Sequence, residues 1–306
     1  MAAEFKSHAN LNGEIELACL YNSRSASKDR QVFRLQIGLD VFAMKVDHLA
    51  DETGPLRGEF ETLQGLHTYF SEHDKLSVPE PLYLSSSGKF CIISFLDGKT
   101  ATVALREKPD SKPAGQVFRK AGLFLNELHE YKGLSVGKLY PNWMFKAIEK
   151  AVATGPYADA SQYTQMYEKF RSQSKNFTQK HYTKGFSHGD FHASNFILGH
   201  GVAHGIDFSE TSEKLVVYDI VDFLKSDIYR LGVLNDVDES GVTKHSKSMF
   251  LKLYQHPLDI AALNFCMRGR LLIDWVRITP ERHAKSTFQQ NKFEQLRTRL
   301  EIAFQN

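Results

Sequence analysis

The chain has 306 residues, of which 42% are hydrophobic and 12% aromatic, and this composition excludes a disordered protein. Its 38 basic and 36 acidic residues leave a formal net charge of +2, which argues against a dedicated nucleic-acid binder. Three cysteines without CxxC spacing argue against a disulfide framework and a thiolate metal site, and no apolar run reaches the roughly 18 residues of a membrane span. The first ten residues lack the apolar stretch of a signal peptide, so we expect a soluble protein of a reducing compartment, the cytoplasm.

The first hundred residues contain short β-type runs around one helical stretch. Gly38-Leu39-Asp40 separates two of these runs and is typical of a tight hairpin turn. Apolar residues at spacings of three and four from Leu56 to Phe70 predict a helix, which ends before Val78-Pro79-Glu80-Pro81. Strands are expected at residues 15–20, 32–37, 41–46, 82–84 and 90–96. The order β-β-β-α-β-β predicts a small β-rich lobe.

Beyond Asp97 helical patterns dominate the chain. A helix is expected over residues 117–128, with Ser111 as its N-cap. Residues 143–182 are expected to form two helices, and residues 196–208 a second hairpin. Further helices are expected at residues 218–231, 258–276 and 293–304. We therefore expect two lobes, residues 1–97 and residues 98–306, of which the second is larger and mainly helical.

One segment of the second lobe concentrates oxygen-bearing side chains. It runs Ser187-His188-Gly189-Asp190-Phe191-His192-Ala193-Ser194-Asn195, and Gly205-Ile206-Asp207-Phe208 follows it. Phosphoryl transfer needs a carboxylate that orients the attacking hydroxyl and accepts its proton, and hard oxygen ligands that hold magnesium against the phosphates. Asp190 and Asn195 can supply the carboxylate and one metal oxygen, and the intervening hairpin can bring Asp207 beside Asn195. The set predicts a phosphoryl-transfer site.

This segment resembles the catalytic loop of the aminoglycoside phosphotransferase family, a small-molecule branch of the protein-kinase-like superfamily. The family pattern is HGDxxxxN followed by I-D-[FW]. The resemblance implies an α+β, protein-kinase-like two-lobed fold whose N-terminal lobe holds a five-stranded antiparallel sheet and one helix. It implies Asp190 as the catalytic base and His188 as structural support of the loop. It also implies Asn195 and Asp207 as ligands of Mg²⁺.

The first lobe carries further motifs of the same superfamily. Phe42-Ala43-Met44-Lys45-Val46 resembles V-A-I-K, so Lys45 is expected to contact the α- and β-phosphates of ATP. Glu59 resembles the helix glutamate that pairs with this lysine, and Glu61 is the competing choice. Ser94-Phe95-Leu96 resembles the hinge that binds adenine through its backbone.

Two motifs of the second lobe fit the same family. Leu125-Asn126-Glu127-Leu128-His129 resembles the L-x-x-L-H of the helix before the substrate region. Tyr218-Asp219 resembles the Y-D that follows the metal motif, so Asp219 is expected to brace the catalytic loop. Asp222 and Asp227 are expected to face water or, together with Asp219, to bind a cationic substrate.

Two segments depart from the family pattern. Residues 21–30, between the first strands, contain no glycine whose backbone could approach phosphate closely, so the hydroxyl and N–H groups of Ser23 and Ser25 are expected to substitute in part. Residues 281–306 carry five Lys or Arg against three Glu. Antibiotic-modifying members use acidic surfaces to hold cationic aminoglycosides, and the basic segment argues against such a substrate here.

Three functions are compatible with these motifs. The first is a kinase that uses ATP, or GTP, to phosphorylate a hydroxyl of a small molecule such as an amino sugar, a sugar, a choline-like alcohol or a vitamin alcohol. The second is a protein kinase, although Tyr218 stands only eleven positions after Asp207 and no A-P-E follows. The third is a nucleotide-binding pseudokinase with a regulatory role, which the glycine-free loop favours and the intact catalytic set opposes. No pattern indicates an oligomeric state.

Overall fold

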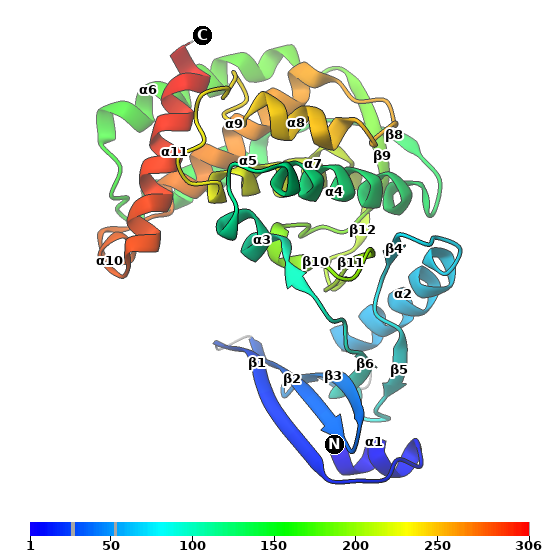
Figure 1. The fold of residues 1–306 in the computed structure, drawn as a ribbon. Coiled ribbons are helices and arrows are strands. Elements are labelled where there is room, and N and C mark those ends of the chain that lie inside the picture. Colours follow the sequence, from blue (N-terminus) through cyan, green and yellow to red (C-terminus); the bar gives the residue numbers. More distant parts are fainter. Residues whose placement is uncertain (26–27, 52–53, 306) are drawn as a thin grey trace. The chain divides into compact units, whose positions relative to one another are not determined.

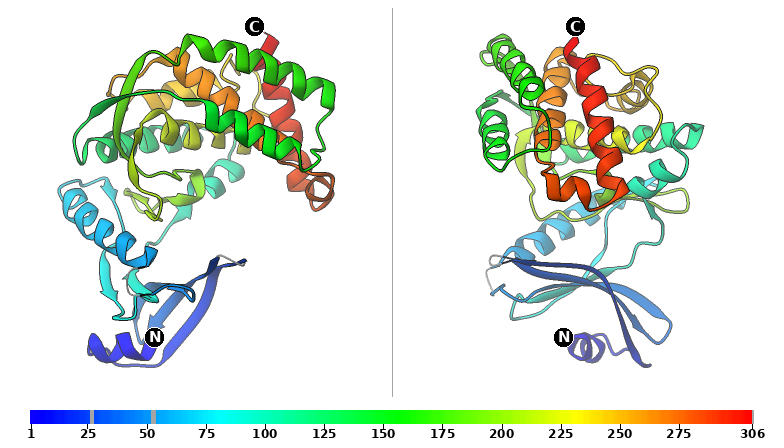
Figure 2. Two further views of the ribbon diagram at one scale, coloured as in Figure 1. Left: turned by 180° about the vertical axis from the view of Figure 1, so that it is seen from behind. Right: turned by 90° about the vertical axis from the view of Figure 1, so that its left-hand side faces the viewer.

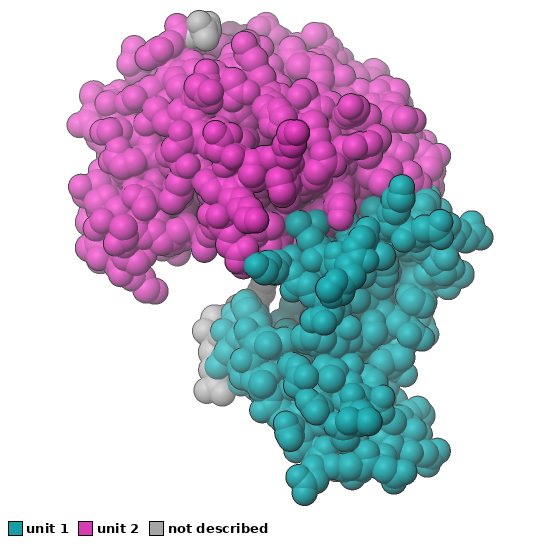
Figure 3. Space-filling model, in the orientation of Figure 1, with its two compact units in different colours: residues 1–99, 197–210 teal, residues 100–196, 211–306 magenta. Residues whose placement is uncertain are grey.

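The structure, a computed structural model, describes residues 1–25, 28–51 and 54–305. The chain divides into two compact units, which Figure 3 colours separately: unit 1 contains Met1–Lys99 and Ile197–Glu210, and unit 2 contains Thr100–Phe196 and Thr211–Asn306. The division expected from the sequence places residues 197–210 in the second lobe. The structure groups them with unit 1, where Ala203 pairs with Leu76 in a parallel ladder.

Unit 1 is built on β-sheets. Its elements are α1 (Ala2–His8), β1 (Ile15–Ser25), β2 (Lys28–Ile37), β3 (Asp40–Asp47), α2 (Pro55–Phe70), β4 (Leu76–Ser77), β5 (Pro81–Leu84), β6 (Phe90–Ser94) and β11 (Ala203–Gly205). The boundary between the two units falls inside two further strands, β7 (Lys99–Thr100) and β10 (Phe196–Leu198). Within the described residues, β1-β2-β3-β6-β5 form a five-stranded antiparallel sheet (Figure 1), which confirms the predicted fold class. A second sheet has the order β4-β11-β10-β7, and helix α1 is an addition to the one helix expected.

The two faces of the larger sheet have different environments. Successive residues of a strand point to opposite faces, so Met44 and Val46 of β3 share one face and Lys45 lies on the other. Met44 and Val46 belong to a hydrophobic cluster that includes Phe5 of α1. Lys45 therefore points away from this cluster, and on that opposite face its Nζ donates a hydrogen bond to Glu59 of α2.

Unit 2 is mainly helical. Its elements are α3 (Ala101–Glu107), α4 (Lys112–Glu130), β8 (Ser135–Lys138), α5 (Asn142–Val152), α6 (Ala160–Gln173), η1 (Ser174–Asn176), β9 (His181–Ser187), η2 (Ala193–Asn195), β12 (Ser212–Leu215), α7 (Val217–Leu224), η3 (Lys225–Tyr229), α8 (Lys244–Leu251), α9 (Ile260–Val276), α10 (Pro280–Ala284) and α11 (Thr287–Gln305). Helix α9 is largely buried and packs against α5, α6, α7 and α11, which Figure 2 shows from two further sides.

A three-stranded antiparallel sheet of order β12-β9-β8 in unit 2 was not expected from the sequence. Strands β8 and β12 are four residues long and largely exposed, so they show no clear apolar alternation. Strand β9 ends at Ser187 and leads directly into His188-Gly189-Asp190. The sheet therefore positions the loop that the sequence marks as catalytic.

Candidate active site

Lys45 is the centre of an ion-pair group within unit 1. Its Nζ donates to Glu59 Oε1 at 2.5 Å and to Asp207 Oδ1 at 3.0 Å. The side chains of Lys45 and Glu59 are 16% and 3% exposed, against 45% for Asp207. Glu61, the competing choice from the sequence, is exposed. Glu59 is thus the carboxylate of α2 that contacts the lysine.

The charge of Lys45 is set by its surroundings. Burial alone would lower the pKa of Lys45, but the carboxylates of Glu59 and Asp207 outweigh burial, and the pKa is raised above its usual value. Lys45 is therefore fully protonated at neutral pH. Cys91, its partner in the ladder between β3 and β6, has a pKa of about 12 because burial disfavours the thiolate. A buried ammonium held by carboxylates is suited to contact phosphate oxygens.

Asp207 follows β11 in an unusual backbone conformation. Its φ is +67°, and Asn10 is the other non-glycine residue with a positive φ in the described part of the chain. Aspartate tolerates this left-handed region better than most residues, and such conformations cluster at functional sites. Its half-exposed carboxylate is a hard oxygen donor of the kind that Mg²⁺ prefers.

The segment expected to be the hinge begins at the end of β6. The N–H of Ser94 donates to the carbonyl of Glu80 (2.9 Å), and its Oγ accepts from the N–H of Glu80 (2.8 Å). Phe95 and Leu96 follow after the strand has ended, and the Arg34 guanidinium lies 5.8 Å from the centroid of the Phe95 ring. The backbone of Phe95 and Leu96 thus lies beyond the ladder, as a hinge would require.

Ser23 and Ser25 lie on strand β1. This strand pairs with β2 as far as Ser25↔Lys28, so most of the segment expected to be a loop is a two-stranded ribbon. Residues 26–27 and the side chain of Ser25 lie outside the described residues. Ser23 is half-buried and stands opposite Arg30 in the ladder between β1 and β2.

Within unit 2, Asp219 of α7 fixes the loop that follows β9. Asp219 Oδ2 accepts from the N–H of His188 (2.7 Å), and Oδ1 accepts from the N–H of Gly189 (2.9 Å). Gly189 has a φ of +88°, a conformation that other residues rarely adopt. The carboxylate of Asp190 is 49% exposed and lies 3.6 Å from Nε2 of His192. The loop backbone is anchored while the carboxylate of Asp190 remains open to a ligand.

Asn195 is buried, and its amide is oriented by the same loop. Nδ2 of Asn195 donates to the carbonyl of Asp190 (3.0 Å), so the amide oxygen is the end available to a metal. Asn195 belongs to unit 2 and Asp207 to unit 1. The amide oxygen of Asn195 is a neutral hard donor of the kind that Mg²⁺ accepts as a ligand.

A buried hydrogen-bond chain supports Asp219. His129 Nε2 lies 3.2 Å from Asp219 Oδ2, and His129 Nδ1 lies 2.9 Å from the hydroxyl of Tyr254. Burial lowers the pKa of His129, so the ring is neutral, with Nε2–H donating to Asp219 and Nδ1 accepting from Tyr254. Burial alone would raise the pKa of Asp219, but hydrogen bonds from His129 and Gly189 outweigh it, and the pKa is lowered. Asp219 is therefore ionised beneath the loop.

His188 lies inside unit 2 with its side chain fully buried. Its Nδ1 accepts from the N–H of Asp190 (3.4 Å), and its ring centroid lies 5.4 Å from that of Phe191. These contacts are of the kind that a residue supporting the loop would make.

The prediction that Asp222 and Asp227 face water is wrong. Asp227 is fully buried and accepts from Arg299 Nη1 (2.6 Å) and Arg230 Nη1 (3.1 Å). Asp222 is 6% exposed and pairs with Arg270 Nη2 (2.6 Å) and Lys225 Nζ (3.2 Å). Internal cations neutralise both carboxylates, which also removes the alternative that they bind a cationic substrate.

No motif in the sequence marks Arg270 or Trp143, which lie next to α7. The guanidinium of Arg270 lies 5.6 Å from the ring centroid of Trp143, and the rings of Trp143 and Tyr218 meet edge to face at 5.5 Å. Arg270 stands in an otherwise largely apolar helical stretch, Ala261–Val276. A charged residue in such a stretch was the signal that could have pointed to it.

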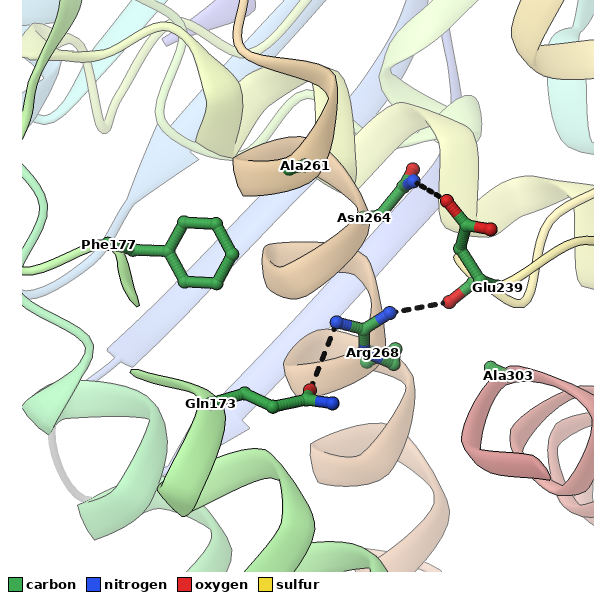
Figure 4. A pocket seen from close by; sticks show the side chains of 7 residues that line it. All are labelled: Gln173, Phe177, Glu239, Ala261, Asn264, Arg268 and Ala303. Atoms are coloured by element: carbon green, nitrogen blue, oxygen red, sulfur yellow. Dashed lines mark hydrogen bonds between the residues drawn. The ribbon is translucent and has the colours of Figure 1, made fainter. Parts of the chain in front are cut away.

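A separate pocket of about 220 Å³ lies within unit 2 (Figure 4). Its walls are formed by Gln173, Phe177, Glu239, Ala261, Asn264, Arg268 and Ala303. Arg268 donates to the carbonyl of Glu239 (2.8 Å) and to Gln173 Oε1 (3.1 Å), and Asn264 donates to Glu239 Oε1 (2.7 Å). None of the residues expected in the active site lines this pocket, and its polar groups bind one another.

A strand lysine paired with a helix glutamate, and an H-G-D loop held by a buried aspartate, are features of the protein-kinase-like class of phosphotransferases. The chain belongs to the phosphotransferase enzyme family, whose model matches residues 24–239. It is therefore a kinase that acts on an alcohol group. No helix in the described ranges combines the length and the apolar character needed to cross a membrane.

Solved structures of the same fold cover nearly the whole chain. Spectinomycin phosphotransferase in complex with ADP and spectinomycin has a TM-score of 0.59 at 13% identity, over 99% of this chain and 97% of that one. Amicoumacin kinase in complex with AMP-PNP, Ca²⁺ and Ami has a TM-score of 0.57 at 18% identity, over 99% and 93%. A choline/ethanolamine kinase family protein from Mesorhizobium loti has a TM-score of 0.58 at 11% identity, over 98% and 95%. No curated protein sequence matches the chain significantly.

Proposed function

We propose that this protein is an ATP-dependent kinase that transfers the γ-phosphate to a hydroxyl of a small molecule. The observation that carries this proposal is the loop of Asp190, whose backbone is anchored by Asp219 while its carboxylate is half-exposed. A general base needs this combination of a fixed position and access to a ligand. Solved structures of the same fold hold ADP or AMP-PNP, which supports a nucleotide as the phosphate donor.

Each residue of the nucleotide site has a chemical role in this proposal. Lys45 contacts the α- and β-phosphates through its protonated ammonium, and Glu59 holds this ammonium in place. The backbone of Phe95 and Leu96 receives the adenine. Asn195 and Asp207 would hold Mg²⁺, which when bound offsets the negative charge of the phosphates. GTP remains the alternative donor, because a backbone hinge can bind either purine.

Asp190 acts on the acceptor in this proposal. Its carboxylate accepts a hydrogen bond from the acceptor hydroxyl and takes the proton as the hydroxyl oxygen bonds to the γ-phosphorus. The bond between the γ-phosphorus and the bridging oxygen breaks, and ADP leaves with that oxygen. Asp219 and His188 act by positioning Asp190 through the loop backbone.

A small-molecule acceptor is favoured over a protein by the chain after Asp207. Ser212–Leu215 forms strand β12, which pairs with β9, and α7 begins two residues later at Val217. A protein kinase uses the corresponding chain to build a peptide platform, and here that chain is short and tied into a sheet. We also place the protein in the cytoplasm, where ATP is available and where cysteines such as Cys19, Cys91 and Cys266 remain free thiols.

The test is a transfer assay with γ-labelled ATP and Mg²⁺ over a library of small alcohols, with generic proteins and the enzyme itself as competing acceptors. We expect transfer to small alcohols, and loss of transfer with retention of ADP binding in Asp190→Asn. Transfer to proteins alone would identify a protein kinase. Nucleotide binding without transfer to any acceptor would identify a pseudokinase.

A further inference from the structure

The loop that carries Asp190 presents two polar side chains that a ligand can reach. Phe191 is fully buried, and its ring stacks on those of Phe124 and Phe223 at centroid distances of 5.5 and 5.2 Å. The residues on either side of it, Asp190 and His192, have side chains that are 49% and 36% exposed. The aromatic packing therefore fixes the middle of the loop, while both neighbouring side chains remain accessible.

Hydrogen bonds within the loop fix its backbone. The carbonyl of Asp190 accepts from the N–H of His192 (2.9 Å) and from Nδ2 of Asn195 (3.0 Å). The carbonyl of His192 in turn accepts from the N–H of Asn195 (2.8 Å). Ser194 ties the loop to α3, because its hydroxyl lies 2.9 Å from that of Thr102. All of these residues belong to unit 2, so the geometry of the loop is defined within one unit.

The ring of His192 is oriented by the backbone of the loop. Its Nδ1 accepts from the N–H of Ser194 (3.2 Å), and this hydrogen bond caps the short helix η2. A ring nitrogen that accepts a hydrogen bond carries no proton, so the single proton of the ring is assigned to Nε2. His192 therefore presents an N–H donor in a fixed position.

This donor lies close to the carboxylate of Asp190 without a hydrogen bond between them. Nε2 of His192 is 3.6 Å from Oδ2 of Asp190, which is longer than a hydrogen bond. Neither atom forms a hydrogen bond with any other residue that the structure describes. A partly exposed donor and a partly exposed acceptor thus stand side by side, and one small group that accepts from the first and donates to the second can bind both.

Few chemical groups can bind both atoms at once. A hydroxyl can, because its oxygen accepts through a lone pair and its hydrogen donates. An ammonium has no lone pair to accept from Nε2–H of His192, and a carboxylate has no hydrogen to donate to Asp190. The two side chains together therefore favour a hydroxyl, which is the group that the proposed reaction phosphorylates.

We propose that His192 is a second catalytic residue, whose Nε2–H donates to the same acceptor hydroxyl that Asp190 deprotonates. This rests on the proposed function, since it concerns the hydroxyl of that reaction. The hydroxyl oxygen accepts from Nε2–H with one lone pair and donates its hydrogen to Asp190, which leaves the second lone pair to attack the γ-phosphorus. The new O–P bond forms as the proton passes to Asp190, and the bond to the bridging oxygen breaks so that ADP leaves with it. His192 keeps its own proton throughout and orients the hydroxyl.

Two substitutions separate the roles of the two ring nitrogens. In His192→Asn, the side-chain oxygen can replace Nδ1 and accept from the N–H of Ser194, but no donor extends as far as Nε2. In His192→Gln, the amide nitrogen can replace the donor at Nε2, but the cap of η2 is lost. We expect His192→Asn to lower kcat/KM for the alcohol at least about tenfold, with KM for ATP and the thermal midpoint unchanged. We expect His192→Gln to stay within about threefold of the wild-type kcat/KM, with a lower thermal midpoint.

The assay uses γ-labelled ATP, Mg²⁺ and whichever of glucose, glucosamine, choline, pyridoxine or a further library alcohol the wild type phosphorylates best. The matched control is His181→Asn, which removes an exposed imidazole from β9 and should leave kcat/KM unchanged. Activity retained in His192→Asn and lost in His192→Gln would show that His192 only caps the loop. That result, or full activity of both variants, would overturn the inference and leave the proposed function standing.

The position of the ring proton provides a second measurement that does not need turnover. ¹⁵N NMR of the imidazole of His192, assigned through its loss in His192→Asn, should show a protonated Nε2 and an unprotonated Nδ1. Where both variants lose activity, this measurement decides: a proton on Nε2 supports the inference, and a proton on Nδ1 overturns it. Absence of phosphate transfer by the wild type to every acceptor would contradict the proposed function, and the inference would fall with it.

Discussion

The carboxylate of Asp219 accepts a hydrogen bond from the backbone N–H of Gly189 at 2.9 Å, one residue before Asp190. Asp219 is 1% exposed and ionised, whereas the side chain of Asp190 is half-exposed. A buried charge of helix α7 thus fixes the backbone from which an accessible carboxylate projects. Substitutions that break the buried hydrogen-bond chain around Asp219 should therefore also lower activity.

Replacement of Lys45 by alanine should impair catalysis without unfolding the protein. The protonated ammonium of Lys45 can donate to phosphate oxygens, and a charge-assisted hydrogen bond is worth about 1.5–3 kcal/mol. We expect kcat/KM for ATP to fall at least about tenfold in Lys45→Ala. Lys89→Ala removes an exposed lysine from the same unit and should have no effect. Equal activity of the two variants would contradict the role of Lys45.

Asp190→Asn should separate binding from transfer. The amide cannot accept the proton of the acceptor hydroxyl, so kcat should fall by about 10²- to 10⁴-fold. The affinity for ADP, measured by calorimetry, should remain within about twofold of wild type, because Asp190 faces the acceptor in the proposed function. A loss of ADP affinity that matches the loss of kcat would assign Asp190 to the nucleotide instead.

Asp207→Asn should weaken the response to magnesium. The substitution removes one negative charge from a proposed hard-cation site, while asparagine still tolerates the φ of +67° at this position. The Mg²⁺ concentration for half-maximal activity should rise at least about tenfold. Asp40→Asn, at an exposed position of β3, is the control. Superimposable magnesium titrations for wild type and Asp207→Asn would exclude Asp207 as a ligand.

His129 should make the free energy of unfolding depend on pH. The pKa of His129 is lowered in the folded state, so below the usual value of about 6.5 the unfolded chain binds a proton that the folded chain does not. Stability should consequently decrease as the pH falls from 7 to 5, by up to about 1.4 kcal/mol per pH unit from this residue. Urea unfolding should show a shallower pH dependence for His129→Gln. His200→Gln, at an exposed loop position, should keep the wild-type slope.

Arg299 and Arg297 offer a matched comparison on α11. Arg299 is fully buried and donates to the carboxylate of Asp227, whereas the side chain of Arg297 is 42% exposed and pairs with Glu294. Arg299→Ala would leave Asp227 without one of its two cations and should cost about 3–5 kcal/mol of unfolding free energy. Arg297→Ala should cost less than about 1 kcal/mol. Similar losses in urea unfolding would show that the burial of Asp227 does not govern stability here.

Local patterns in the sequence were sufficient to predict the larger sheet, and they also predict which residues carry the chemistry. The turn at Gly38 and the alternating strands predicted the order of β2 and β3, because hairpin pairing depends on neighbouring residues. The spacing of Asp190 and Asn195 predicted a loop with one base and one metal oxygen. Strand β9 was missed because its partners β8 and β12 are short and polar and come from distant parts of the chain. Strands of this kind show no periodic pattern of apolar residues from which their pairing could be predicted.

By itself, the sequence determined the family motifs in which Lys45, Asp190, Asn195 and Asp207 stand, because these motifs depend on local spacing, and the proposed roles of the four residues follow from them. Only the tertiary structure decided which carboxylate meets Lys45, because Glu59 and Glu61 differ in the face of α2 that they occupy. It also decided that Asp222 and Asp227 are paired with arginines 48 and 72 residues away along the chain. Such pairs form where the packing of helices brings charges into a shared interior, and burial rather than sequence proximity then selects the partner.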